Sequence, residues 1–163
     1  MDEFLIRPIE PSDQRFLWEM LYHAIHVSEG QEPPPRDIIY QPELAKYVED
    51  WGRPGDLGSL AEDAETHAPV AAAWIRQLAG DHRGYGWVSD EIPELSVAAL
   101  PGYRGRGLGT RLIEHALQLA RQQYAAVSLS VSTDNRAAAL YRRLGFVEVG
   151  RDEGGALVML LRF

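Results

Sequence analysis

A glycine-rich turn between a strand and a helix, at residues 101–113, limits most strongly what this chain can fold into. An apolar run from Leu95 to Leu100 ends at Pro101, three glycines follow at alternate positions, and an apolar helical pattern begins at once. Glycine accepts positive φ angles and lets a ligand approach the backbone closely, because it carries no Cβ. A helix that starts there directs unpaired N–H groups and the positive end of its dipole to one point. The pattern therefore predicts an anion site, most naturally for phosphate or pyrophosphate.

The same turn, PGYRGRGLGTRLI, also carries positive charge. Its three alternate glycines are Gly105, Gly107 and Gly109, and its arginines are Arg104, Arg106 and Arg111. Guanidinium groups suit phosphate oxygens, so the arginines are expected to add fixed positive charge to the site. A plain tight turn before a helix is the alternative, but it does not account for three glycines together with the arginines.

Length and charge bound the class of protein. The chain has 163 residues, of which 45% are hydrophobic and 25% charged, as expected for a single globular domain over residues 1–163. Its net charge of −8 makes it a poor candidate for binding nucleic acid.

The absence of cysteine excludes disulfides, thiolate metal sites and a cysteine nucleophile. The first residues, MDEFLIRP, show neither the basic nor the apolar region of a signal peptide. No apolar run approaches membrane-spanning length. We therefore expect a cytoplasmic protein with no membrane partner.

Hydrophobic periodicity and turn residues predict an α+β fold with α/β/α-like layers. The sheet is expected to be mixed, mostly antiparallel and of six to seven strands, with about four helices. The expected strands are residues 4–9, 60–62, 70–78, 94–100, 126–132, 146–149 and 157–161. The expected helices are one of about four turns through residues 16–25, one from Pro42 to Gly52, one over residues 107–123, and one that Asp134 or Asn135 caps and that ends near Gly145.

Two common phosphate-binding motifs fit the turn poorly. A P-loop needs a lysine before its Ser or Thr, whereas Thr110 follows Gly109. A Rossmann loop needs a third glycine where Thr110 stands, and it follows the first strand of its unit rather than the fourth or so.

A third pattern fits closely. Arg104-x-x-Gly107-x-Gly109 resembles the Arg/Gln-x-x-Gly-x-Gly/Ala signature of the GNAT acyltransferase superfamily, which binds acetyl-CoA. A second block, NRAAALYRRLGF from Asn135 to Phe146, resembles the later GNAT segment in which an asparagine opens a helix and a tyrosine precedes Leu-Gly-Phe. The order of the elements is also similar to that family, so the resemblance implies the GNAT fold.

The resemblance implies roles for the residues around the turn. The backbone N–H groups of Gly105, Arg106, Gly107, Leu108, Gly109 and Thr110, with Arg104, are expected to hold the pyrophosphate of CoA. The strand residues Val97, Ala98 and Ala99 are expected to pair with the pantetheine arm, and the Ala99 amide to stabilise the developing oxyanion. Asn135 is expected to contact the same arm, although a role as a helix cap alone would explain it.

The resemblance also implies catalytic groups. Tyr141 matches the tyrosine whose hydroxyl points at the CoA sulfur, where it can donate a proton or a hydrogen bond. Glu94 stands where some members carry a catalytic glutamate, and it is interpreted either as the general base or as a surface glutamate at a strand end. Asp90 and Glu91 are weaker candidates for the base.

The acceptor is expected to be a primary amine of a small molecule or peptide. The acidic stretch at residues 43–65 suggests a cationic acceptor, and Trp74, Tyr85 and Trp87 are candidates for an aromatic wall. No metal site is expected, because His23 and His26 lie on one helix without a partner element.

Three readings of the whole chain stay open. An N-acetyltransferase is favoured, and because no cysteine can carry the acetyl group, transfer would be direct. A CoA-binding regulatory or sensor module without turnover is the alternative, and a nucleotide-binding protein is a third. Homodimers are frequent in the resembling family, so a homodimer is an open alternative to a monomer.

Overall fold

The computed structural model describes residues 2–163. Over this range seven strands form one sheet in the order β1-β2-β3-β4-β5-β7-β6, with four α-helices around it. The strands are β1 (Phe4–Pro8), β2 (Leu57–Asp63), β3 (Pro69–Arg76), β4 (Glu94–Ala99), β5 (Ala126–Val131), β6 (Val147–Arg151) and β7 (Leu157–Arg162). The helices are α1 (Gln14–Ala24), α2 (Pro42–Ala45), α3 (Leu108–Ala120) and α4 (Ala137–Arg143). Neighbouring strands are antiparallel except for β4 and β5, which confirms the expected fold class.

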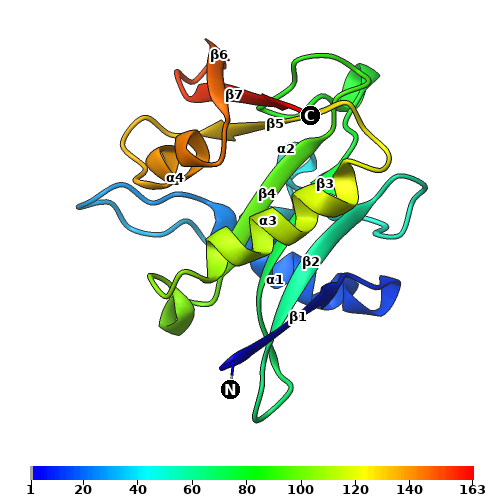
Figure 1. Ribbon diagram of the computed structural model, residues 1–163. Coiled ribbons are helices and arrows are strands. Elements are labelled where there is room, and N and C mark those ends of the chain that lie inside the picture. Colours follow the sequence, from blue (N-terminus) through cyan, green and yellow to red (C-terminus); the bar gives the residue numbers. More distant parts are fainter. Residues whose placement is uncertain (1) are drawn as a thin grey trace.

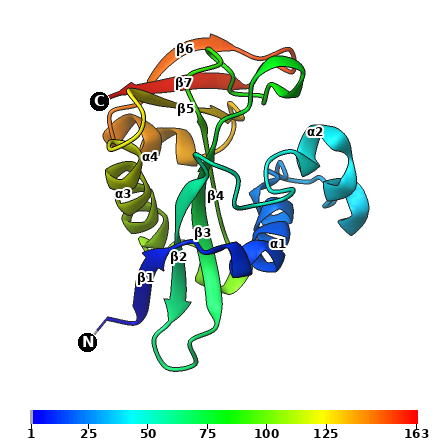
Figure 2. The same ribbon diagram turned by 90° about the vertical axis from the view of Figure 1, so that its right-hand side faces the viewer.

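Helices cover both faces of the sheet. Figure 2 shows α3 and α4 against one face and α1 and α2 on the other side. Strand β3 alternates accordingly: Ala71, Ala73 and Ile75 pack in the core that α3 covers, whereas Ala72 and Trp74 pack in the core that α1 covers. Because both faces of β3 are buried, the strand reads in the sequence as one continuous apolar run.

The two long helices follow their expected hydrophobic spacing. Leu17, Met20 and Leu21 of α1 are buried, as are Leu112 and Ala116 of α3. Helix α1 has 11 residues, which is about three turns rather than the expected four, because Ile25 adopts an extended backbone conformation. Within residues 2–163, no helix is both long enough and apolar enough to cross a membrane.

The expected helix from Pro42 to Gly52 is wrong in its length, since α2 ends at Ala45. Helix growth needs the carbonyls of one turn to accept N–H groups four residues on. Here the Arg76 side chain of β3 occupies two of these carbonyls, because it donates to that of Lys46 at 3.0 Å and to that of Glu49 at 2.6 Å. The buried strand therefore overrides the local helical pattern.

The sheet divides between β4 and β5, its two parallel strands. Within the described residues their register is a single pair, Glu94 opposite Ser128, and beyond that pair the two strands diverge (Figure 1). The far end of β4, which leads into the glycine-rich turn, therefore has a free edge that faces a gap in the sheet.

Candidate active site

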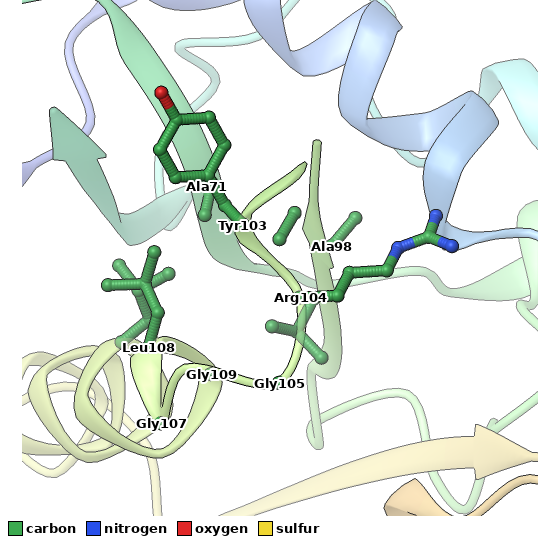
Figure 3. Close-up of a pocket in the computed structure, with 11 residues that line it drawn as sticks. Ala71, Ala98, Tyr103, Arg104, Gly105, Gly107, Leu108 and Gly109 are labelled. Atoms are coloured by element: carbon green, nitrogen blue, oxygen red, sulfur yellow. The ribbon is translucent and has the colours of Figure 1, made fainter. Parts of the chain in front are cut away.

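A groove runs along the gap between β4 and β5 and continues over the glycine-rich turn. Its main part has a volume of about 1040 Å³ and is lined by α1 with the loop after it, by β4 and β5, and by α4. A smaller pocket of about 190 Å³ is lined by the glycine-rich turn (Figure 3). Both share the lining residues Val97, Ala98, Ala99 and Arg104. The structure thus joins the predicted anion site to the free edge of β4.

Backbone N–H groups of β4 point into this groove. Leu100, directly after the strand, donates its N–H to the carbonyl of Val70 on β3 at 2.9 Å. Backbone groups alternate in direction along a strand that pairs antiparallel, so the N–H groups of Val97 and Ala99 face the other way, into the gap. They are placed to pair with an extended ligand that lies beside β4.

The glycine-rich turn presents a run of unpaired amides. The N–H groups of residues 105–110 have no hydrogen-bond acceptor within the described part of the chain. The N–H of Arg104 bonds the carbonyl of Pro101, and the N–H of Arg111 bonds that of Gly107, each at 3.5 Å, so the run is bounded on both sides. It includes the first turn of α3, where the helix dipole is positive. An anion is the ligand that this arrangement suits.

The three glycines of the turn serve different needs. Gly105 and Gly107 both have a φ of +74°, which strains any other residue. Gly109 has no such angle, and a Cβ there would meet nothing closer than Leu140 Cδ2 at 4.0 Å. Neither strain nor crowding inside the chain requires glycine at position 109, so its bare backbone leaves room for a ligand.

The side chains of the three arginines do not all face this anion site. Arg104 lines the groove, and its guanidinium reaches toward α1, where it lies 3.5 Å from the His23 carbonyl (Figure 3). Arg106 lies over the rings of Phe4 and Tyr103, at 5.8 and 5.4 Å from their centroids. Arg111 pairs with Asp2 at 3.7 Å. The expectation that three guanidinium groups face the anion site is therefore wrong: Arg106 and Arg111 point elsewhere, and Arg104 lines the groove with its guanidinium against α1.

Glu94 lies at the base of the groove and is only 5% exposed. The Tyr47 hydroxyl donates to its Oε2 at 2.6 Å, and the Gly86 N–H donates to its Oε1 at 2.8 Å. Burial raises the pKa of Glu94 to about 7, against these hydrogen bonds, which favour the charged form. The surface interpretation of Glu94 is therefore wrong, and the carboxyl group is poised to exchange a proton near neutral pH.

A loop packs tightly over this carboxyl group, and Gly84 is its closest point. A Cβ at position 84 would collide with Glu94 Oε1 and lie 2.5 Å from the Tyr47 hydroxyl. We expect Gly84→Ala to destabilise the protein by about 1–3 kcal/mol, as overpacking does. Urea denaturation would measure this, with Gly150→Ala as the control, because position 150 has open space around it. Equal stability of the two variants would show that the loop does not press on Glu94.

Tyr141 reaches the groove from the opposite face of the sheet. It packs in the α3 core with its ring 6.0 Å from that of Phe146, and burial raises the pKa of its hydroxyl to about 12. Its hydroxyl has no hydrogen-bond partner within residues 2–163. Asn135 also lines the groove, where its Oδ1 accepts the Ala137 N–H at 2.9 Å at the start of α4. The gap between β4 and β5 thus brings Glu94 and Tyr141 into one groove.

Several other candidates lie outside the groove. Trp74 is 1% exposed in the core, and Trp87 donates its indole N–H to Asp90 at 2.8 Å. Glu91 accepts a hydrogen bond from Ser89. Of the expected aromatic wall, Tyr85 alone lines the groove.

The acidic side chains of residues 43–65 do not line the groove either. Asp56 forms a buried ion pair with Arg76 at 2.8 Å, and Glu62 binds Arg7 at 3.1 Å. This part of the argument for a cationic acceptor is therefore wrong. The two histidines of the α1 region are paired as well, His23 with Glu19 and His26 with Asp134.

Sequence reasoning missed three residues near Glu94. Tyr47 holds the carboxyl group from 47 positions away. Ser128 faces Glu94 across the strand pair, and its buried Oγ has no hydrogen-bond partner within residues 2–163. Asp152, in the turn after β6, also lines the groove. No local pattern marks any of the three, since tertiary contacts alone bring them to Glu94.

The chain is similar to known acetyltransferases. Residues 18–146 match the model of the family described as Acetyltransferase (GNAT) family. Streptothricin acetyltransferase of Streptomyces lavendulae is 32% identical over 121 residues, which are 72% of this chain and 64% of that protein. N-alpha-acetyltransferase RimI of Mycobacterium tuberculosis is 37% identical over 99 residues, which are 48% of this chain and 61% of that protein. The matches thus span just under two thirds of each of these relatives.

A solved structure shows the same fold. Spermidine N-acetyltransferase from Vibrio cholerae, in complex with CoA and spermine, superposes with a TM-score of 0.63 at 20% identity. The superposition covers 98% of this chain and 95% of that one.

Proposed function

Because this chain belongs to the GNAT family of acetyltransferases, we propose that it transfers an acetyl group from acetyl-CoA directly to a primary amine of a small molecule or peptide. One observation carries the proposal. The unpaired amides of residues 105–110 adjoin the free edge of β4, in the same groove as Glu94 and Tyr141. This groove would therefore offer a diphosphate site, an edge for an extended arm and two groups that exchange protons.

The residues present fit acetyl-CoA as the donor. The amides of residues 105–110 and the Arg104 guanidinium would hold its pyrophosphate. The amides of Val97 and Ala99 would pair with the pantetheine arm, as a neighbouring strand does. Ala98 keeps the side chain on this part of β4 small, and Asn135 would contact the same arm. The Ala99 N–H would donate to the thioester carbonyl oxygen as negative charge develops on it.

Glu94 would act as the general base. A lysine-like amine has a pKa of ~10.4, so well under one in a thousand is unprotonated at pH 7. A carboxylate with a pKa of about 7 is matched to taking that proton, directly or through a water molecule. Acetyl-CoA, when bound, supplies the activated acetyl group, so that a C–N bond forms as the C–S bond breaks.

Tyr141 would stabilise the leaving sulfur. Its hydroxyl stays protonated at neutral pH, because burial raises its pKa to about 12. It has no competing partner in the described residues and can donate a hydrogen bond to a thiolate. The chain contains no cysteine that could carry the acetyl group, so the amine would receive it directly.

We also propose a domain organisation and a cellular location for the chain. All seven strands belong to one sheet, which supports a single domain over residues 1–163. The donor also suggests a location in the cytoplasm, where acetyl-CoA is available.

A panel of primary amines with acetyl-CoA tests the function. We expect free CoA thiol to appear together with acetylated amine, measured by a thiol reagent and by mass spectrometry. Calorimetry with acetyl-CoA supplies the second measurement. Tight binding without thiol release across the panel would favour the regulatory module, and no binding at all would overturn both readings.

Tyr141→Phe is expected to lower kcat by roughly 100-fold, the effect of losing a positioned proton donor. Its affinity for acetyl-CoA and its melting temperature should change little, because the hydroxyl has no partner in residues 2–163. Tyr124→Phe is the matched control: it removes a 2.8 Å hydrogen bond to the Gly55 carbonyl far from the groove, so it should lower stability and spare kcat. Unchanged turnover of the Tyr141 variant would rule out its role at the sulfur.

A further inference from the structure

A second carboxylate, that of Asp152, lines the same groove as Glu94. Its Oδ2 accepts the Ser130 hydroxyl at 3.1 Å and its Oδ1 accepts the Ala156 N–H at 3.0 Å, so its position is fixed from two sides. Within residues 2–163, no Lys, Arg or His side chain lies within 4.0 Å to form an ion pair with it. Its negative charge is therefore available to a ligand cation that enters the groove.

The positions of Asp152 and Glu94 relative to each other follow from their partners on β5. Ser128 lies opposite Glu94, and Ser130, which holds Asp152, is two residues further on the same face. Two residues of a strand advance by about 7 Å. The two carboxyl groups therefore lie in one row, and each feels the other's charge, because Asp152 adds to the raised pKa of Glu94.

The space between them suits a polar end and an apolar body. Ser130 and Asp152 line the groove together with Glu94, whereas the Ser128 hydroxyl between them is 0% exposed and does not line it. Ile38, Leu44 and Tyr85 line the same groove and supply apolar surface for methylene groups. Lys46 is the nearby cation, but its Nζ donates to the Arg83 carbonyl at 2.5 Å.

Building on the proposed function, we propose that Asp152 binds the second, non-reacting ammonium group of a dicationic acceptor while Glu94 takes the proton from the first. The substrate class is then a diamine with an aliphatic spacer. The chemistry of the reaction does not change: the amide bond forms at one nitrogen, and the other keeps its proton and its charge.

Diaminobutane and butylamine test the proposal, because they differ only in the second charge. For the unaltered enzyme we expect kcat/KM to be roughly ten-fold higher for diaminobutane, the size of a charge-assisted hydrogen bond. Asp152→Asn should remove that preference by raising the KM for diaminobutane. It should leave the KM for acetyl-CoA within about two-fold, and any change in kcat that follows from the lost charge near Glu94 should be equal for diaminobutane and butylamine.

Asparagine can keep both structural bonds of Asp152, since its oxygen can accept the Ala156 N–H and its amide can donate to Ser130. Glu148→Gln is the control, because Glu148 pairs with Arg151 on β6 outside the groove. If the Asp152 variant does not fold, salt replaces it: the KM for diaminobutane of the unaltered enzyme should rise with ionic strength and that for butylamine should not.

The outcomes separate the two proposals. If neither amine is acetylated, nor any other in the panel, the proposed function fails. If both are acetylated with equal kcat/KM and equal salt dependence, the function stands and the role of Asp152 is overturned. A loss that is equal for both amines in the Asp152 variant would likewise assign Asp152 a purely structural role.

Discussion

Gly109→Leu is expected to abolish acetyl-CoA binding while leaving the protein as stable as before or more so. The position lies in the first turn of α3 with an ordinary helical backbone, and a Cβ there meets nothing closer than 4.0 Å. Leucine favours a helix over glycine by up to about 1 kcal/mol. The same side chain would stand over the unpaired amides of residues 105–110, where the diphosphate is proposed to bind. Stability and binding are therefore expected to change in opposite directions.

Calorimetry with acetyl-CoA and a thermal melt measure the two effects. The affinity should fall at least about 100-fold, which corresponds to about 2.7 kcal/mol. Gly102→Ala is a close control, because Gly102 precedes the three alternate glycines, has open space around it and does not line the pocket. If the Gly109 variant binds acetyl-CoA as tightly as this control, the diphosphate does not lie on the start of α3.

The helices and strands that could be predicted from the sequence are those whose apolar residues recur at helical or strand spacing and are also buried in the fold. Helix α3 buries Leu112 and Ala116 at helical intervals, and β5 alternates as expected, because tertiary packing agrees with the local pattern there. Between Lys46 and Glu49 the two disagree. The guanidinium of Arg76 takes the carbonyls that a longer helix would use. Hydrophobic periodicity is judged over stretches of roughly 11–18 residues, so it cannot reveal a hydrogen bond between Arg76 and Lys46.

The candidate site also has parts that could be predicted from the sequence and parts that could not. The glycine-rich turn was predictable because phosphate chemistry needs its residues side by side in the chain. The direction of the arginines was not, since Arg106 turns to the rings of Phe4 and Tyr103. The environment of Glu94 depends on Tyr47 and on the loop at Gly86, which only the packed sheet brings together.

Glu94→Gln is expected to lower kcat/KM at neutral pH by roughly 100-fold or more, as removal of a general base does. The pH profile identifies the cause. In the unaltered enzyme, kcat/KM should rise with pH along a limb with an apparent pKa of about 7, because only the ionised carboxylate can accept a proton. The Gln variant should lack that limb and keep only the pH dependence of the amine. Asp90→Asn, an exposed carboxylate outside the groove, should leave both the rate and the limb unchanged.

The stability of the same variant supplies a test that needs no substrate. The pKa of Glu94 is raised from 4.5 to about 7 in the folded protein. Below pH 4.5 the folded and unfolded states both carry the proton on Glu94, so its titration does not lower the free energy of unfolding. As pH rises to 7, the unfolded chain releases its proton while the folded one holds it, and stability is lost; above 7 the loss is complete. Glutamine escapes this loss because it stays neutral, and the Tyr47 hydroxyl can turn to accept from its amide. The melting temperature of Glu94→Gln, relative to that of the unaltered protein, should therefore rise between pH 4 and pH 8. A difference that stays constant over this range would show that burial does not hold a proton on Glu94, and its assignment as a base poised near neutral pH would fall with it.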